Sequence, residues 1–339
     1  MLLDHDDVQT EIGAALRGAL DPGMSAAQVR DCLAGLGMFG VELRAEAGGL
    51  ELGLSRGVIV CAELGRAAAH DGYRAATLLA DLLPEMDLLS VPPPAADGIP
   101  ASIVHCGPGS WRPESPDTAV LTGDGIAPDP LDGAQFLVLS LASDTNPTFG
   151  VLPAAGITAS GHTGTLPARV GFGGRCVRVA GDRTVLARAH IRQAAYLLGC
   201  AEAAHALATA RAATRSQFGT QLGSYQAVAF PLAAQLAELA ATRLLVHRAA
   251  WLADQDGPAG QLRLAATEAL AGASELAFTV TRHAVHVHGA YGMTHAAPVH
   301  RYYLTVAIEA TRWGSAAQLW REAAALRVPA AAQQPAVAS

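Results

Sequence analysis

The sequence is poor in charge. Only 16% of its 339 residues are Asp, Glu, Lys or Arg, whereas 51% are hydrophobic. The net charge is -7, and acidic and basic residues are mixed along the chain without a basic cluster. Because nucleic-acid-binding proteins concentrate Lys and Arg on one face, we expect no nucleic-acid partner. The apolar, alanine-rich composition and the length instead favour a helix-rich globular protein with a substantial core.

Cysteine is also scarce. The five cysteines are odd in number and scattered, without a CxxC pair, which excludes a disulfide framework and suggests a reducing compartment. The first residues, MLLDHDD, lack the basic segment and apolar core of a secretory signal. No uncharged apolar run approaches the roughly 18 to 20 residues that a bilayer span requires. We therefore expect a cytoplasmic protein with no membrane span.

Residues 1–95 have the pattern of an N-terminal helical domain. Helical spacing of apolar residues begins near Asp4, Ser25 is the predicted N-cap of a second helix, and Ser55 that of a third. A further helix is predicted from Tyr73 to Leu83.

The composition changes after the proline-rich stretch 91–100. Residues 96–182 are rich in Gly, Pro, Val and Thr, and the runs DTAVLTG, AQFLVLSL and RCVRVAG are typical of strands separated by turns. Residues 183–328 are helical again, and the tail 329–339 is predicted to be disordered. Four long helices are predicted in this bundle, over 185–216, 224–254, 258–287 and 299–326. The predicted fold class is therefore mostly α with a small central β unit, ending in a four-helix bundle.

The stretch HVHGAYGMTHAAPVHRYY begins at His286 and holds four histidines. On a helix, His286 and His288 would point about 200° apart and could not share one metal ion. We therefore favour histidines that satisfy local hydrogen bonds over a metal site. Gly289, which follows a long helix, permits a left-handed end and a close approach of backbone to a ligand or a neighbouring chain.

Three segments together resemble the acyl-CoA dehydrogenase family. They are LAGLGMFGVELRAEAGGLELG, RAATRSQFGTQLGSYQAVAFPLAAQLAEL and HAVHVHGAYGMTHAAPVHRYYLTVAIEATRWGS, in the family's order. The resemblance implies an N-terminal helical domain, a central β domain and a C-terminal four-helix bundle, usually in tetramers that hold FAD between subunits.

The resemblance also implies a set of FAD-contacting residues. Arg215 and Phe218 would hold the pyrophosphate and adenine end of an FAD lodged mainly in the adjacent subunit, because a guanidinium fork matches phosphate oxygens and an aromatic face covers a flat ring. The family usually shows Gln-x-x-Gly-Gly where this chain has His286, Gly289 and Ala290. The implied cofactor-binding residues are Arg215, Phe218, Gln226, His286, Gly289, Ala290, Gly314 and Ser315.

The family's catalytic base is missing. Most members place a Glu before Gly-Thr at the start of the last helix, but this chain has Trp313 before Gly314 and Ser315. An indole cannot accept a proton at neutral pH. Glu309, one helical turn earlier, is the remaining candidate for a base, although a structural role is favoured over it. The family's loop that lines the flavin, similar to Thr-Glu-Pro-x-x-Gly-Ser-Asp, is not found between Ala101 and Asp182.

This asymmetry predicts one subunit of a heteromeric acyl-CoA dehydrogenase. A homologous partner with the catalytic glutamate would desaturate a bulky acyl-CoA, as in the actinobacterial two-component enzymes for steroid side-chain thioesters, and this chain would complete its FAD site. Two alternatives stay open. One is a stand-alone flavoenzyme with altered chemistry on an acyl or carrier-protein thioester, with Arg312 and Trp313 in a new site. The other is a non-catalytic scaffold subunit.

Overall fold

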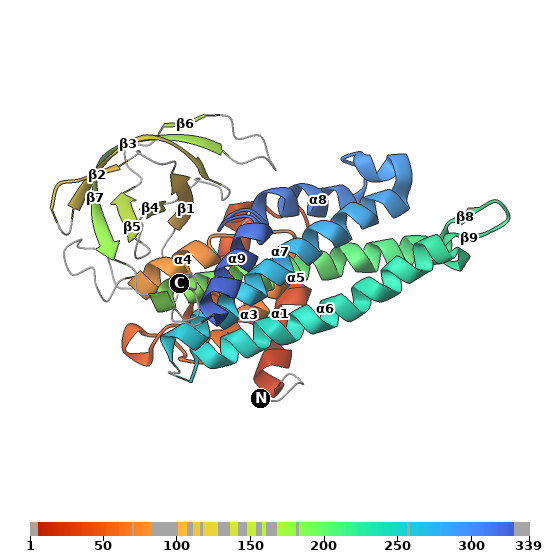
Figure 1. Ribbon diagram of the computed structural model, residues 1–339, viewed down its shortest axis with the longest axis horizontal. Helices are drawn as coiled ribbons and strands as arrows, with labels where there is room; N and C mark the ends of the chain where they lie inside the picture. The colour runs from red at the N-terminus through yellow and green to blue at the C-terminus, as the bar shows by residue number, and fades with distance from the viewer. Residues whose placement is uncertain are drawn as a thin grey trace, which may run out of the picture.

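The computed structural model describes residues 6–328 except 70, 83–100, 107–110, 116–117, 128–135, 142–147, 154–157, 161–167, 181–182 and 256–257. The N-terminal helices are α1 (Asp7–Ala19), α2 (Ala26–Gly35), α3 (Leu54–Arg66) and α4 (Tyr73–Leu82). A β unit and a helical bundle follow them, which confirms the predicted fold class (Figure 1). The domain limits 1–95, 96–182 and 183–328 remain predictions, and the tail predicted to be disordered lies outside the described residues.

Side-chain caps determine where the first helices begin. Asp6 caps α1, because its carboxylate accepts from the Gln9 backbone N–H at 2.8 Å while the Gln9 side chain accepts from the Asp6 N–H at 3.1 Å. Ser25 caps α2 in the same reciprocal manner with Gln28, as predicted.

The predicted cap of the third helix is wrong. Helix α3 begins at Leu54, after Gly53 with φ 80°, and glycine has no side chain with which to cap it. Asp254, at the end of a bundle helix, supplies the missing acceptor: its carboxylate accepts from the backbone N–H groups of Leu54 at 2.7 Å and Ser55 at 2.9 Å. The cap is therefore a tertiary contact, which no local pattern could reveal.

The β unit is a curled sheet. Its strands are β1 (Ala101–Cys106), β2 (Trp111–Pro113), β3 (Thr118–Ala127), β4 (Phe136–Leu141), β5 (Thr148–Pro153), β6 (Thr158–Ser160) and β7 (Ala168–Ala180). Their order is β2-β3-β1-β4-β5-β7-β6, and β3 also pairs with β7, so five strands form a closed ring of pairings. Only β1 and β4 run parallel among the described pairs. The three predicted strand runs fall in β3, β4 and β7.

The bundle holds five helices in the described part of the chain, namely α5 (Arg183–Thr214), α6 (Gln226–Ala253), α7 (Ala259–His288), α8 (Pro298–Glu309) and α9 (Ala316–Arg327). The first three match predicted helices to within a few residues. The fourth prediction, one helix over 299–326, is wrong. The chain turns between Glu309 and Ala316 because Gly314 adopts φ 112° and Ser315 caps a new helix.

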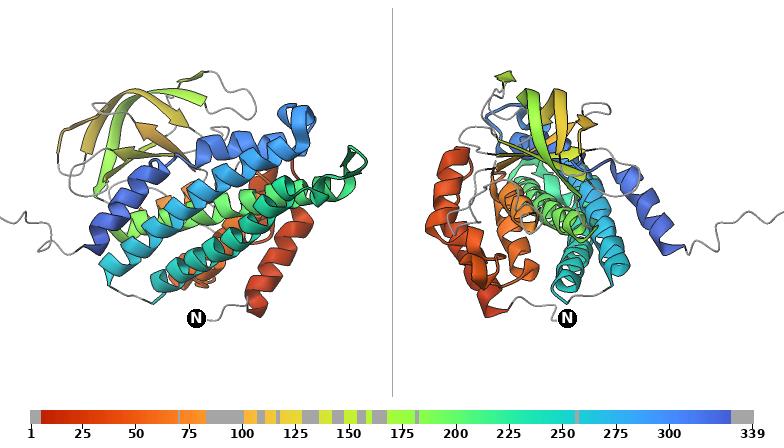
Figure 2. Two further views of the ribbon diagram at one scale, coloured as in Figure 1. Left: turned by 45° about the vertical axis from the view of Figure 1, so that its right-hand side comes forward. Right: turned by 90° about the vertical axis from the view of Figure 1, so that its left-hand side faces the viewer.

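Two glycines bring the N-terminal helices against the bundle. A Cβ at Gly65 of α3 would overlap the carbonyl oxygen of Tyr196, and one at Gly199 of α5 would overlap that of Ala62. The backbones of α3 and α5 therefore touch where they cross. The β unit lies to one side of the helices, next to α4 (Figures 1 and 2).

Helix α6 is long and apolar enough to cross a bilayer by length and composition alone, although the sequence analysis predicts no span. Only 22% of its most apolar window is buried within the chain. Its exposed apolar side chains include Phe230, Leu236, Leu244 and Trp251. An exposed apolar surface of this kind is typical of an interaction site.

Candidate functional site

A projecting hairpin carries two of the predicted cofactor residues. After α5, strands β8 (Ser216–Gln217) and β9 (Thr220–Gln221) pair antiparallel, and the hairpin extends beyond the rest of the bundle (Figure 1). The two turn residues, Phe218 and Gly219, have φ 52° and 84°. Two-residue hairpins favour positive φ at both positions, but an aromatic residue there is strained.

Phe218 gains no packing in return for this strain, since it is 96% exposed. Arg215, which follows α5, holds the base of the hairpin through its carbonyl oxygen, which accepts from the Leu222 N–H at 2.8 Å. Its guanidinium is exposed and forms no hydrogen bond with any described residue. Gln226, the first residue of α6, is exposed as well. The Phe218 ring and the Arg215 guanidinium therefore lie exposed on one short segment, where both could contact a ligand.

The end of α7 carries the other predicted turn. Gly289, with φ 65° and ψ -149°, leaves the helix in a conformation open to glycine, and a Cβ there would meet nothing within 4 Å. The exposed His286 ring stacks on His283 with ring centroids 6.4 Å apart, and Ala290 is exposed. His288 Nδ1 lies 2.8 Å from the Ala284 carbonyl oxygen, a local contact of the predicted kind. The end of α7 and the hairpin lie at the same end of the bundle (Figures 1 and 2).

The remaining predicted residues lie in the turn between α8 and α9. Gly314 makes the turn, and Ser315 accepts from the Gln318 N–H at 3.3 Å while its hydroxyl donates to Gln318 Oε1 at 2.9 Å. Ser315 is thus the N-cap of α9. The structure therefore does not bring Gly314 and Ser315 to the hairpin end, and gives both a role in starting the helix.

Trp313, at the family's base position, packs against His190 of α5. The two ring centroids are 5.7 Å apart at an interplanar angle of 59°. His190 is 4% exposed and forms no hydrogen bond with any described residue. Burial lowers the pKa of His190 to about 4, so the imidazole is neutral at physiological pH. His190 is not predicted from the sequence, because nothing in the local sequence marks it as a neighbour of Trp313.

Glu309 is buried in a network of ion pairs. It is 4% exposed, and its carboxylate accepts from Arg74 Nη1 at 2.9 Å, from Arg312 Nη2 at 2.8 Å and from Gln193 Nε2 at 2.9 Å. Burial opposes its charge, yet the Arg312 and Arg74 guanidinium groups hold the pKa of Glu309 well below its usual range. Such a carboxylate is a poor proton acceptor, so the geometry favours the structural role for Glu309.

Arg312 is part of this network. It is 5% exposed and donates hydrogen bonds to both Glu309 oxygens. Arg312 is therefore not presented to a ligand, as the stand-alone alternative would require. Arg74 and Gln193 are not predicted from the sequence, because no periodic signal connects them with Glu309 across the separation in sequence.

Comparison with known proteins finds similarity to one family. Residues 178–328 match the acyl-CoA dehydrogenase C-terminal domain. The chain is 31% identical over 189 residues to acyl-CoA dehydrogenase FadE27 of Mycobacterium tuberculosis, covering 53% of this chain and 49% of that protein. It is 37% identical over 124 residues to benzylmalonyl-CoA dehydrogenase of Aromatoleum aromaticum, covering 35% of this chain and 31% of the relative. The matches thus span half or less of these relatives' length.

Solved structures extend the likeness to nearly the whole chain. The Tcur3481–Tcur3483 steroid ACAD, solved as a variant, has a TM-score of 0.78 and 25% identity over 96% of both chains. The ChsE4–ChsE5 complex from Mycobacterium tuberculosis has a TM-score of 0.80 and 22% identity over 99% of this chain and 100% of the other, a likeness of fold. The chain therefore resembles the acyl-CoA dehydrogenase family in the sequence of residues 178–328 and in its fold, and the members of that family are FAD-dependent flavoproteins.

Proposed function

We propose that this chain is a cytoplasmic subunit of a heteromeric acyl-CoA dehydrogenase that desaturates a bulky acyl-CoA thioester. A homologous partner carries the catalytic glutamate, and this chain completes the partner's FAD site in an αβ tetramer. The single observation that carries the proposal is the occupant of the base position. An indole stands there, and the carboxylate one turn away, Glu309, is held by two buried guanidinium groups.

The hairpin end fits an FAD donated by a neighbour. Arg215 offers uncommitted N–H donors for pyrophosphate oxygens, and Phe218 offers a fully exposed ring face for adenine. The open space beside Gly289 supports a close approach of backbone to ligand, with Gln226, His286 and Ala290 at the same end of the bundle. When bound, FAD supplies the hydride acceptor for desaturation. Gly314 and Ser315 lie in the turn between α8 and α9 and not at the hairpin end, so the structure gives less support for their contact with this FAD.

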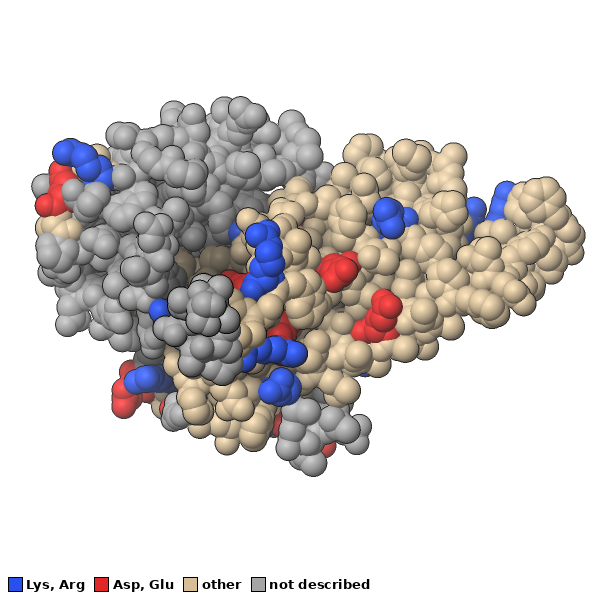
Figure 3. Space-filling view, in the orientation of Figure 1, with Lys and Arg blue, Asp and Glu red and all other residues tan. Residues whose placement is uncertain are grey.

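A partner subunit is supported by the exposed surface of the bundle. Helix α6 leaves large apolar side chains in water, and charged side chains cover only small parts of the bundle face in Figure 3. Two of the structural neighbours bear the names of paired proteins, Tcur3481–Tcur3483 and ChsE4–ChsE5. Burying α6 against a homologous chain would remove this surface from water.

Co-expression tests whether the partner supplies the catalytic glutamate while this chain completes the FAD site. The chain is purified alone and together with a homologous dehydrogenase that has the glutamate, and flavin content and acyl-CoA oxidation are measured. We expect activity and bound flavin only in the mixed complex. Arg215→Ala should lower the flavin content of that complex, whereas Arg321→Ala, which removes an exposed arginine of α9, should not. A yellow, active homo-oligomer of this chain alone would refute the proposal, and an Arg215→Ala complex with full flavin would favour the scaffold alternative.

One observation favours the second candidate, a stand-alone flavoenzyme acting on an acyl or carrier-protein thioester. His190 is an imidazole in contact with Trp313 at the base position, and histidine is the most frequent general base, although burial lowers its pKa to about 4 and so weakens it as a base. Under this alternative the chain alone would bind FAD, and His190→Ala would abolish its activity while keeping the flavin.

A further inference from the structure

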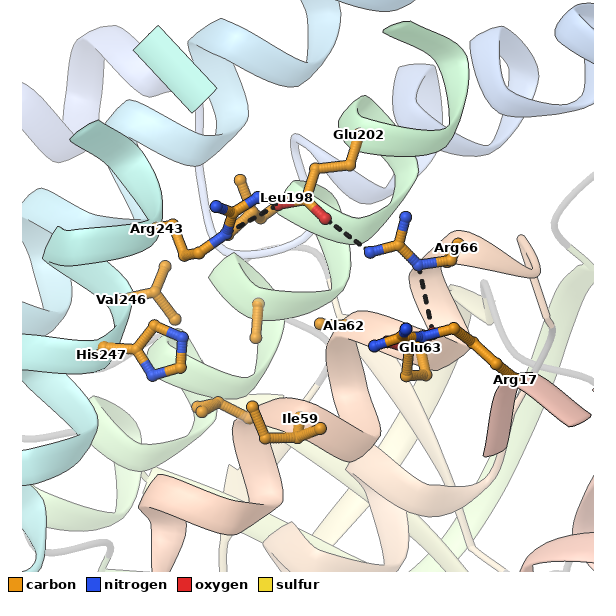
Figure 4. A pocket seen from close by; sticks show the side chains of 12 residues that line it. Arg17, Ile59, Ala62, Glu63, Arg66, Leu198, Glu202, Arg243, Val246 and His247 are labelled. Carbon is orange, nitrogen blue, oxygen red and sulfur yellow. Dashed lines mark hydrogen bonds and ion pairs between the residues drawn. The ribbon is translucent and has the colours of Figure 1, made fainter. Parts of the chain in front are cut away.

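A groove separate from the predicted cofactor residues lies between the N-terminal helices and the bundle. It has a volume of about 310 Å³ and is lined by residues of α1, α3, α5 and α6 (Figure 4). This volume is at the lower end of the range for small-molecule sites, roughly 300 to 1,000 Å³. Arg243 in its wall lies about 25 Å along α6 from Gln226, at 1.5 Å per residue. The groove is therefore not part of the hairpin end.

An alternating row of charges forms one edge of the groove. Glu63 accepts from Arg17 Nε at 2.9 Å and from Arg66 Nε at 3.1 Å. Glu202 accepts from Arg66 Nη2 at 2.7 Å and from Arg243 Nε at 3.1 Å. The two carboxylates are nearly buried, with side-chain exposures of 5% and 11%, and both oxygens of each are engaged.

The guanidinium groups, unlike the carboxylates, keep hydrogen-bond donors without a partner among the described residues. Arg17, Arg66 and Arg243 have side-chain exposures of 56%, 36% and 46%, and among the described residues they pair with two carboxylates, so the row carries one net positive charge. Each guanidinium has five N–H donors. Both Nη atoms of Arg17 and the Nη1 atoms of Arg66 and Arg243 form no hydrogen bond with described residues. The row thus has donors and charge left for one anion.

The rest of the groove is partly apolar. Ile59 of α3 and Val246 of α6 line it together with the ring of His247, and Leu198 of α5 lies beside Glu202 (Figure 4). A fully charged ligand such as a dianionic phosphate ester would match neither this apolar part nor the single excess charge. A carboxylate matches a guanidinium fork, and an alkyl or aryl body matches the apolar part.

We propose that this groove binds a small amphipathic monocarboxylate, with its carboxylate on free N–H groups of the arginine row and its apolar body against Ile59 and Val246. Such a site places a carboxylic acid at the contact between the N-terminal helices and the bundle. Its occupancy does not depend on flavin or on the partner's base, so it goes beyond the proposed function and is tested without either.

Isothermal titration of the full chain with hexanoate tests the proposal, with hexanol as the neutral probe. We expect saturable binding of one hexanoate and none of hexanol. Arg243→Gln should weaken hexanoate binding roughly tenfold or more, because it removes a charged donor. Arg248→Gln is the matched control, since Arg248 lies on the same helix with the same 46% exposure and pairs with Glu268 instead.

Arg17→Gln gives a second test if Arg243→Gln fails to fold. Arg17 is the most exposed of the three arginines and makes one ion pair, so its removal leaves the Arg66–Glu202–Arg243 contacts in place. It should also weaken hexanoate binding. Equal affinity for hexanol, no saturable binding, or affinities unchanged by both arginine substitutions would overturn the proposal.

Discussion

The hairpin end of the bundle and the turn between α8 and α9 differ in how many of their polar and aromatic side chains have partners within the chain. At the hairpin, Phe218 is strained and exposed, and the Arg215 guanidinium has no hydrogen-bond partner among the described residues. At the turn, Glu309 is buried with donors on both oxygens, and Trp313 packs on His190. Strain and unmet donors on a surface indicate a ligand from outside, whereas a closed polar network stabilises the fold. This contrast supports the proposal that the chain keeps the part of the family site that serves a neighbour.

The largest expected effect comes from opening the closed network. Glu309→Ala leaves the Arg74 and Arg312 guanidinium groups buried without their shared carboxylate, and we expect a loss of about 3–5 kcal/mol in the free energy of unfolding. Urea denaturation followed by circular dichroism measures it. Glu322→Ala is the control, because Glu322 is 33% exposed in its pair with Arg263 and should cost no more than about 1 kcal/mol. Equal losses for both variants would show that the network does not hold the turn.

A second effect follows from the buried imidazole of His190. Burial lowers its pKa from 6.5 to about 4, so the unfolded chain binds more protons than the folded chain between these values. The free energy of unfolding therefore falls as the pH drops from about 6.5 to about 4, by up to about 3 kcal/mol from this group. His190→Leu should make the stability of the chain less dependent on pH in that window. His295→Gln, at an exposed position, should keep the wild-type dependence, and an unchanged slope in His190→Leu would contradict the burial of a neutral imidazole.

The sequence was sufficient for the features that arise locally. The reciprocal cap of α2 by Ser25 and Gln28, the strand runs, and three of the four predicted bundle helices depend on spacing within a few residues. The family segments also located Phe218 and Gly289, whose positive φ angles agree with tight turns.

The sequence could not reveal contacts between distant segments. The start of α3 is capped by Asp254, and the Glu309 network draws on Arg74 and Gln193 from two other helices. Helix periodicity continued through 310–315, so the break at Gly314 was missed although a glycine followed by a capping serine was present. The groove with the arginine row is likewise assembled from four helices, and no motif connects them.

The smallest expected effect concerns the strain at the hairpin. Phe218 adopts φ 52° with its ring 96% exposed, and glycine enters this region at no steric cost. Phe218→Gly should therefore leave the stability of the chain within about 1 kcal/mol of the wild type, because relief of strain and the entropy of glycine oppose each other. The same substitution should lower the flavin content of the mixed complex, because the exposed aromatic face is lost. Thermal unfolding of the isolated chain and the absorbance of released flavin measure the two effects separately.

Gln221→Ala is the matched control, since Gln221 is an exposed residue of the same hairpin and should change neither quantity. If Phe218→Gly destabilised the isolated chain by several kcal/mol, the ring would be part of the fold and the contrast between the hairpin and the turn would disappear. If stability and flavin content were both unchanged, the strained Phe218 ring would contribute nothing to flavin binding. A strained residue that contributes nothing to its own fold, yet is required by a neighbour's flavin, is the outcome that distinguishes a completed interface site from a remnant of the family's sequence.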